Sequence, residues 1–318
     1  MIFSSTRSRR LKLRSTPFPP EWRAILHRRF PLLDCLPLED QQELAGHIQV
    51  FLAEKQFEGC DGLVITDEIR VVIAAQACLL LLHRDSDYYP DLKSILVYPS
   101  TYHSRVTEED EEQKAAFAGQ SWLRGPVILA WDAVQGGASD RSDGQNVVFH
   151  EFAHQLDEED GQVDGVPVLG AKGPLPERLS RYRSWARILS REFEELRRAS
   201  EEGQSSVLDD YGATNPAEFF AVATECFFEK PRPLRQKHPE LYDELKRFYQ
   251  QDPAAWRSPA AGGNAEGRMK NEEWRVQNAE YSRPWPRHLF LPIRQLSWIN
   301  AWPRRPLTPP ARTRGTLI

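Results

Sequence analysis

Residues 148–157 read V-F-H-E-F-A-H-Q-L-D, and the interpretation of the whole chain starts from this stretch. On an α-helix, His150 and His154 lie one turn apart on the same face, so both imidazoles can reach one metal ion. Glu151 lies one step round the helix, where it can contact a water molecule bound to that ion. The segment therefore predicts a metal-binding helix.

The apolar residues of the segment favour the same interpretation. Val148, Phe152 and Leu156 recur at four-residue spacing on another face, which would anchor the helix in the core and leave the histidines facing a cleft. The alternative is an ordinary helix that carries two histidines by chance. The amphipathic pattern and a strand predicted just upstream favour the metal site. Two ligands and one general base in this order are typical of H-E-x-x-H zinc peptidases.

A catalytic zinc ion needs a third protein ligand and leaves its fourth position to water. His238 precedes a proline at a helix start and His288 lies near the C-terminus, so neither is well placed. Segment 215–229, N-P-A-E-F-F-A-V-A-T-E-C-F-F-E, places Glu218 and Glu225 seven residues apart on one face of an apolar helix. A carboxylate is costly to bury there unless it meets a cation. Either glutamate can be the ligand while the other hydrogen-bonds a ligand histidine. The alternative for each is an ordinary solvent-facing glutamate.

Composition is typical of a globular protein: 40% of the 318 residues are hydrophobic and 27% are charged, enough for one large domain or two small ones. No apolar run reaches the roughly 18–20 residues of a membrane span, and the basic N-terminus lacks the apolar region of a secretory signal. The four cysteines are scattered without a C-x-x-C pair, which favours reduced thiols. We therefore expect a cytoplasmic protein without a membrane partner.

Charge is distributed unevenly along the chain. The net charge is −5, but residues 258–318 contain ten Lys/Arg and four Glu, so the rest of the chain carries −11. Phosphate binding requires a basic surface. An acidic body therefore argues against nucleic acid as the main partner.

Composition and periodicity divide the chain into three parts. We expect a flexible basic arm at 1–20, a folded domain at 21–257 and a disordered tail rich in Pro, Arg and Trp at 258–318. The folded domain comprises a helical part at 21–90 and a part with the metal helix at 91–257. Periodicity predicts helices at 22–30, 37–55, 63–82, 148–157, 179–199, 215–229 and 238–249, strands at 94–99 and 127–131, and loops at 136–144 and 158–176.

Several linked motifs resemble the Mlc titration factor A family of bacterial zinc peptidases. They are H-E-F-A-H-Q-L-D at 150–157, Y-G-A-T-N-P-A-E-F-F-A-V-A-T-E-C-F-F at 211–228, G-Q-S-W-L-R-G-P-V-I-L-A-W at 119–131, P-L-L-D-C-L at 31–36, V-Y-P at 97–99 and F-Y-Q-Q-D-P at 248–253. The similarity runs from about Pro31 to Trp256. Several motifs in the right order are far more specific than H-E-x-x-H alone.

The resemblance implies a zincin-like metallopeptidase of the gluzincin type, similar to the catalytic domain of anthrax lethal factor. Its fold is α+β and mostly helical, with a small mixed sheet beside the H-E-x-x-H helix. The resemblance also implies His150, His154 and Glu218 as ligands of Zn²⁺, and Glu151 as the general base. Tyr211 matches a family tyrosine whose hydroxyl can donate to an oxyanion. The alternative for Tyr211 is a packed aromatic residue at the helix entry.

Two further carboxylates are candidates for support of the ligands. With Glu218 as the ligand, Glu225 is expected to hydrogen-bond a ligand histidine. Asp157 either orients a ligand histidine or is an exposed carboxylate at the helix end. The strand at 127–131 is expected to be the sheet edge along which an extended peptide substrate pairs.

The resemblance implies aminopeptidase-like activity. For particular members it also implies binding of the glucose repressor Mlc, which relieves repression of the sugar phosphotransferase system. The competing hypothesis is a non-catalytic protein that sequesters a transcriptional regulator. Glu151 favours the peptidase, because a purely structural metal site needs ligands and no base.

Overall fold

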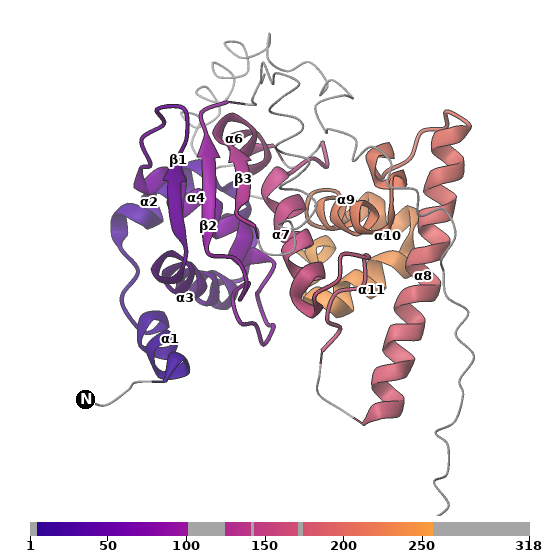
Figure 1. Cartoon of the computed structure of the whole chain (residues 1–318), viewed down its shortest axis with the longest axis horizontal. Helices are drawn as coiled ribbons and strands as arrows, with labels where there is room; N and C mark the ends of the chain where they lie inside the picture. Colours follow the sequence, from indigo (N-terminus) through magenta and orange to yellow (C-terminus); the bar gives the residue numbers. More distant parts are fainter. Residues whose placement is uncertain (1–4, 101–124, 141–142, 171–173, 257–318) are drawn as a thin grey trace, which may run out of the picture. The chain divides into compact units, whose positions relative to one another are not determined.

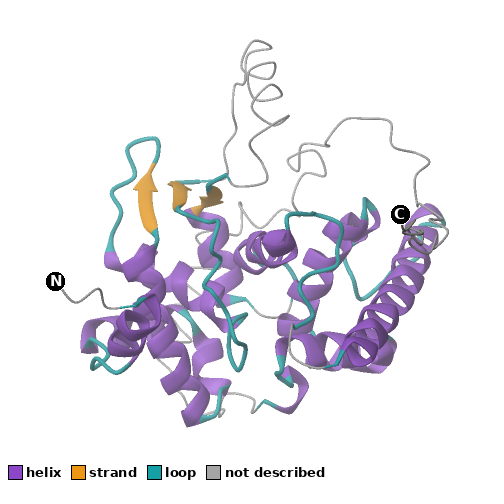
Figure 2. Cartoon of the chain, turned by 60° about the horizontal axis from the view of Figure 1, so that its bottom comes forward, coloured by secondary structure: helices purple, strands orange, loops and turns teal. Residues whose placement is uncertain are grey.

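Most of the described chain is helical, and its strands gather in one small sheet (Figure 1, Figure 2). The computed structural model describes residues 5–100, 125–140, 143–170 and 174–256. All of them belong to one unit, Met1–Gly263. The expected tail at 258–318 lies outside the described residues. The α-helices are α1 (Thr6–Arg14), α2 (Pro20–Arg29), α3 (Leu38–Glu54), α4 (Asp67–Leu79), α6 (Trp131–Ser139), α7 (Val147–Asp157), α8 (Leu175–Glu201), α9 (Pro216–Glu229), α10 (Pro231–Lys237) and α11 (Pro239–Tyr249).

The sheet consists of β1 (Gln56–Gly59), β2 (Ser94–Tyr98) and β3 (Val127–Ala130) in that order. Phe57 pairs with Ile95, and Ile95 with Val127. The mostly helical α+β fold is confirmed, but the described strands are all parallel, whereas we expected a mixed sheet. β1 was missed because its four residues follow α3 almost directly and lack the β-branched run that signals a strand.

The expected loop at 136–144 is wrong for its first residues, because α6 continues to Ser139. Gly136 and Gly137 lower the helix propensity of α6, but Gly137 is needed for packing. A Cβ on Gly137 would lie 2.9 Å from Cγ of Asn146, the residue that precedes α7. Glycine therefore lets α6 approach the start of α7 closely.

The N-terminal arm also differs from the expectation. Residues 6–14 form α1, which packs against α3. Arg10 Nε and Nη2 each donate to a different carboxylate oxygen of Glu54 at 2.9 Å, and Nη1 donates to Asp87. A two-point guanidinium–carboxylate pair of this kind fixes geometry as well as charge. The segment is therefore a docked helix over 6–14 rather than a flexible arm.

α7 lies inside the fold, in contact with α4, α6, β3 and α9 (Figure 1). Val148, Phe152 and Leu156 are buried as their spacing predicts. The ring of Phe152 packs against Phe51 of α3 and against Tyr89, with ring centroids 5.7 Å and 4.8 Å away. The apolar face of α7 therefore fixes the helix against the N-terminal part of the chain. No helix among the described residues is long and apolar enough to span a bilayer.

A polar cluster joins α3 to the segment that follows α4. His47 lies within hydrogen-bond distance of Glu43 (3.1 Å) and of the Tyr88 hydroxyl (2.8 Å). Glu43 also accepts from the backbone N–H of His83. The hydrogen bond with His47 outweighs the effect of burial and lowers the pKa of Glu43 to about 2. Ionised Glu43 therefore stabilises the folded state.

We expect Glu43→Gln to destabilise the protein in a pH-dependent way. The pKa of Glu43 is lower in the folded than in the unfolded state, so its contribution is present above about pH 4.5 and is lost as pH falls toward 2. Urea unfolding with chelator should show the gap between wild type and variant narrowing below pH 4.5. Glu39→Gln, at an exposed position of the same helix, is the control. A gap for Glu43→Gln that stays constant with pH would contradict this assignment.

Candidate metal centre

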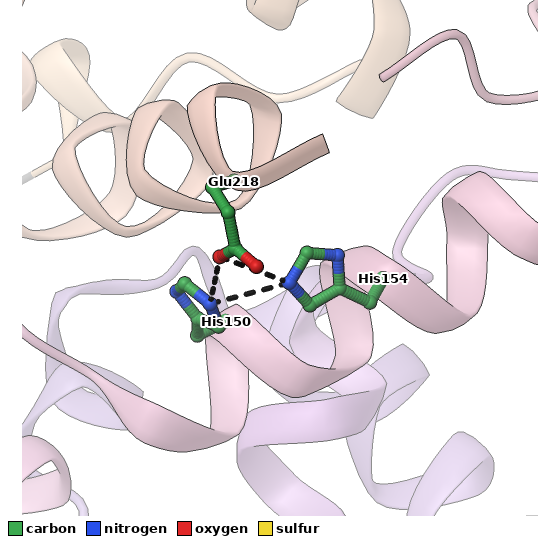
Figure 3. Close-up of side chains that lie close together, drawn as sticks. All are labelled: His150, His154 and Glu218. Carbon is green, nitrogen blue, oxygen red and sulfur yellow. Dashed lines mark hydrogen bonds and ion pairs between the residues drawn. The ribbon is translucent and has the colours of Figure 1, made fainter. Parts of the chain in front are cut away.

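α7 and α9 bring three predicted ligand residues together (Figure 3). Both histidines point from α7 toward α9, and Glu218 points back from the first turn of α9. Asn215 accepts hydrogen bonds from the N–H groups of Ala217 and Glu218, and Pro216 occupies the first helical position, as the sequence predicts. The start of α9, and with it Glu218, is thus set by local sequence.

The distances within the cluster fit a tetrahedral metal site. Oε2 of Glu218 lies 3.0 Å from Nε2 of His150 and 3.4 Å from Nε2 of His154, and the two Nε2 atoms are 3.2 Å apart. Ligands at the usual zinc distances of about 2.0–2.1 Å are about 3.3 Å from one another in a tetrahedron. A divalent ion therefore fits between these atoms without rearrangement of the side chains.

The chemistry of the three facing atoms also fits a cation. Nδ1 of His150 lies 2.7 Å from Oε1 of Glu225, and a carboxylate is a natural acceptor for an Nδ1–H group. In that tautomer, Nε2 of His150 carries a lone pair and faces the carboxylate of Glu218. Two acceptors repel each other at 3.0 Å unless a proton or a metal ion lies between them.

The pKa shifts reflect this demand for positive charge. Burial lowers the pKa of His150, but hydrogen bonds to Glu218 and Glu225 outweigh it and raise the pKa well above its ordinary value. Burial raises the pKa of Glu218, but hydrogen bonds with His150 and His154 outweigh it and lower the pKa to about 2. The site thus favours an ionised carboxylate and a cation beside it.

Behind His150, a chain of hydrogen bonds joins four helices. Oε2 of Glu225 accepts from the backbone N–H of Asn146, whose side-chain Oδ1 caps α7 by accepting from the N–H groups of Val148 and Phe149. Nδ2 of Asn146 lies 2.9 Å from Gln76 in α4 and 3.0 Å from both Gly137 O in α6 and Glu229 in α9. Asn146 therefore fixes the helix start and the partner of His150 together.

Sequence reasoning placed Glu225 beside a ligand histidine but gave no role to Asn146, Gln76 or Glu229. A signal existed in two cases: Asn is a favoured cap directly before a helix, and Gln76 is an isolated amide in an apolar helix. The sequence contained no such signal for Glu229, because a glutamate at a helix end is usually solvated. Here it is buried, and burial followed by the negative charge of Glu225 raises its pKa well above the ordinary value.

Glu151 and Tyr211 both lie beside the three predicted ligands. Glu151 is half-buried, its side chain makes no hydrogen bond to another described residue, and its charge acts on both His150 and Tyr211. The ring of Tyr211 lies 6.0 Å from that of His150, centroid to centroid. Burial, followed by the charges of Glu218 and Glu151, raises the pKa of Tyr211. Its hydroxyl therefore stays protonated and able to donate at neutral pH.

Asp157 has a different environment from either expectation. It is fully buried rather than exposed, and burial raises its pKa to about 6. Oδ2 accepts from the N–H of Gly165 at 2.8 Å. Oδ1 of Asp157 and Nδ1 of His154 are both buried, and neither has a hydrogen-bond partner among the described residues. Asp157 thus holds the loop that follows α7 and makes no direct hydrogen bond to a ligand histidine.

Comparison with known proteins agrees with this geometry. Residues 3–250 match the family described as glucose-regulated metallo-peptidase M90. An uncharacterized protein of Synechocystis sp. is 45% identical over 251 residues, which is 77% of this chain and 89% of that protein. Mlc titration factor A of Serratia proteamaculans is 34% identical over 248 residues, 74% of this chain and 88% of the relative. Mlc titration factor A of Escherichia coli K12 is 31% identical over 229 residues, which is 70% of this chain and 83% of that relative.

We expect Asn146→Ala to cost more stability than Asn215→Ala. Both variants lose a helix cap worth about 0.5–2 kcal/mol. Asn146→Ala additionally leaves buried groups of Gln76 and Glu229 without their donor, at about 1–3 kcal/mol. Urea unfolding with chelator measures both losses without a contribution from bound metal. Equal losses would show that the Nδ2 contacts add nothing to the cap.

Proposed function

Because the chain belongs to the family of glucose-regulated M90 metallopeptidases, we propose that it is a zinc-dependent aminopeptidase. This membership confirms the resemblance inferred from the sequence motifs. The observation that carries the proposal is the cluster of His150, His154 and Glu218 between α7 and α9. Two imidazoles and one carboxylate are a donor set that suits a catalytic zinc ion and leaves a position for water.

In this proposal, bound zinc would lower the pKa of a water molecule at the site and polarise the scissile carbonyl. Glu151 takes the proton of the attacking water and delivers it to the leaving amine. Tyr211 donates its hydroxyl proton in a hydrogen bond to the oxyanion. Glu225 holds the imidazole of His150 in the orientation that presents Nε2 to the metal.

We further propose that an extended peptide binds along β3. This strand contacts α7, and no described strand pairs with its other side. Ile128 in its middle is 56% exposed, which is unusual for a large apolar side chain in a strand. Backbone hydrogen bonds to β3 would hold a peptide in register while its scissile bond lies at the metal centre.

Removal of the proposed base tests the chemistry. We expect Glu151→Gln to lower kcat by roughly 10²- to 10⁴-fold and to leave zinc affinity nearly unchanged, because Glu151 is not a ligand. Hydrolysis of amino-acid p-nitroanilides measures the activity, and metal analysis after dialysis measures the zinc content.

Two controls make this experiment decisive. Chelator should abolish wild-type hydrolysis, and added zinc should restore it. N-terminally acetylated substrates should react poorly if the enzyme is an aminopeptidase. Hydrolysis that survives both the substitution and the chelator would refute the metallopeptidase mechanism.

The names of two relatives support a second candidate function. These relatives are called Mlc titration factor A, so we propose that this chain also binds a repressor of the Mlc type. The non-catalytic alternative is that repressor binding is its only activity.

We expect Glu151→Gln to bind such a repressor as tightly as the wild type does, because binding does not require the general base. Calorimetric titration of the purified repressor into each protein measures this. No binding to either protein would exclude the regulatory role. Tight binding without any peptide hydrolysis would favour the non-catalytic alternative.

A further inference from the structure

Gly165 lies where three helices meet. Its N–H donates to Oδ2 of Asp157, the last residue of the metal helix α7, at 2.8 Å. Its carbonyl oxygen accepts from Nε1 of Trp185 in α8 at 2.9 Å. Its φ of +78° lies in the left-handed region that favours glycine. One backbone unit is thus tied to α7 and to α8 at the same time.

The third contact is with the start of α9. A Cβ atom on Gly165 would lie 2.4 Å from the carbonyl oxygen of Pro216 and 2.8 Å from its carbonyl carbon. Pro216 is the first residue of α9, two positions before Glu218. The missing side chain of Gly165 therefore lets the first turn of α9 approach the end of α7.

We propose that Gly165 is a positioning residue of the metal centre. It sets the separation between α7 and the first turn of α9, and hence the distance from the Glu218 carboxylate to the two imidazoles. This inference rests on the proposed function in so far as that function requires a metal ion at the three ligands.

Small displacements matter here because metal coordination is strict. Ordinary contact with a Cβ begins at 3.4 Å, so the carbonyl oxygen of Pro216 would have to withdraw by about 1 Å to accommodate a methyl group. Ligand distances in functional metal sites hold to within about 0.2 Å. Moving the turn that carries Glu218 by five times that tolerance would remove one of three ligands.

The displacement caused by a methyl group at Gly165 is expected to be confined to the first turn of α9. Further along α9, Glu225 is held by His150 and Asn146, and Thr224 by the hydroxyl of Tyr249. These contacts lie more than one helical turn from Pro216 and do not involve Gly165. A methyl group at Gly165 would therefore shift Glu218 while the partner of His150 keeps its place.

The experiment compares Gly165→Ala with Gly161→Ala in the full chain. Gly161 lies in the same loop at φ +86°, but a Cβ there meets nothing within 4 Å, so it reproduces the backbone strain without the clash. Zinc affinity is measured by competition with a chromogenic chelator. We expect Gly165→Ala to weaken zinc binding roughly 10- to 100-fold, as loss of a supporting contact at a metal site typically does, and Gly161→Ala to bind like the wild type.

A fall in zinc affinity caused by general destabilisation must be distinguished from one caused by displacement of Glu218. Leu44→Ala, a buried cavity-forming substitution in α3, is the control for destabilisation, and urea unfolding with chelator ranks all variants. Zinc affinity should fall for Gly165→Ala and not for Leu44→Ala. Equal losses of affinity in these two variants, or wild-type affinity of Gly165→Ala, would overturn the proposal.

If Gly165→Ala does not fold, the zinc affinity of Trp185→Phe tests the proposal instead. It removes the Nε1–H donor to Gly165 and keeps an aromatic ring against Phe220 and Phe248. A several-fold loss of zinc affinity supports the proposal, and unchanged affinity overturns it. A wild-type protein that binds no divalent metal would instead contradict the proposed function, which distinguishes the two failures.

Discussion

The close packing of α7 against α9 is the constraint on which the proposed metal centre depends. The Glu218 carboxylate of α9 faces Nε2 of His150 and of His154 in α7 at 3.0 and 3.4 Å, and acceptor atoms at these distances repel each other unless a proton or a metal ion lies between them. Apolar burial on the other faces keeps the two helices at this separation, and both helices are rich in buried Val, Ala and Phe. The hydrogen bond from Asn146 to Glu225 and the close packing of Gly165 against Pro216 then fix where along the two helices the contact occurs. The fold therefore holds together a cluster that requires a positive charge, either a proton or a metal ion, between its acceptor atoms.

Helical spacing was enough to predict which side chains could meet, but not their individual places. The four-residue interval put His150 and His154 on one face, and the seven-residue interval did the same for Glu218 and Glu225. Periodicity alone could not say which glutamate faces the metal, because both occupy the same face. In the structure they lie on opposite sides of one imidazole: Glu218 faces Nε2 of His150 and Glu225 faces Nδ1. Only the resemblance to a known family distinguished the two before the structure did.

The features that sequence reasoning missed depend on contacts between distant segments. α1 is held in place by ion pairs of Arg10 with Glu54 and Asp87, neither of which is near Arg10 in sequence. α6 persists through two glycines because one of them lies against Asn146. Gly165 looked like one more glycine in a loop, and its role appears only when Pro216 is placed beside it. Local propensity describes each segment by itself, whereas these positions are decided by what the segment packs against.

The proposed metal ligands come from two segments whose separation in the chain has a consequence for biosynthesis. Glu218 follows His150 by 68 residues, so a ribosome must add all of α8 and the start of α9 after the histidine pair has been made. Until then the nascent chain presents two imidazoles and a neighbouring carboxylate without the third ligand. Metal capture in vivo is thus expected to be a late event of maturation, coupled to closure of α9 over α7. Cells that are short of the metal would accumulate a fully synthesised chain in which no metal ion joins the side chains of α7 to Glu218 of α9.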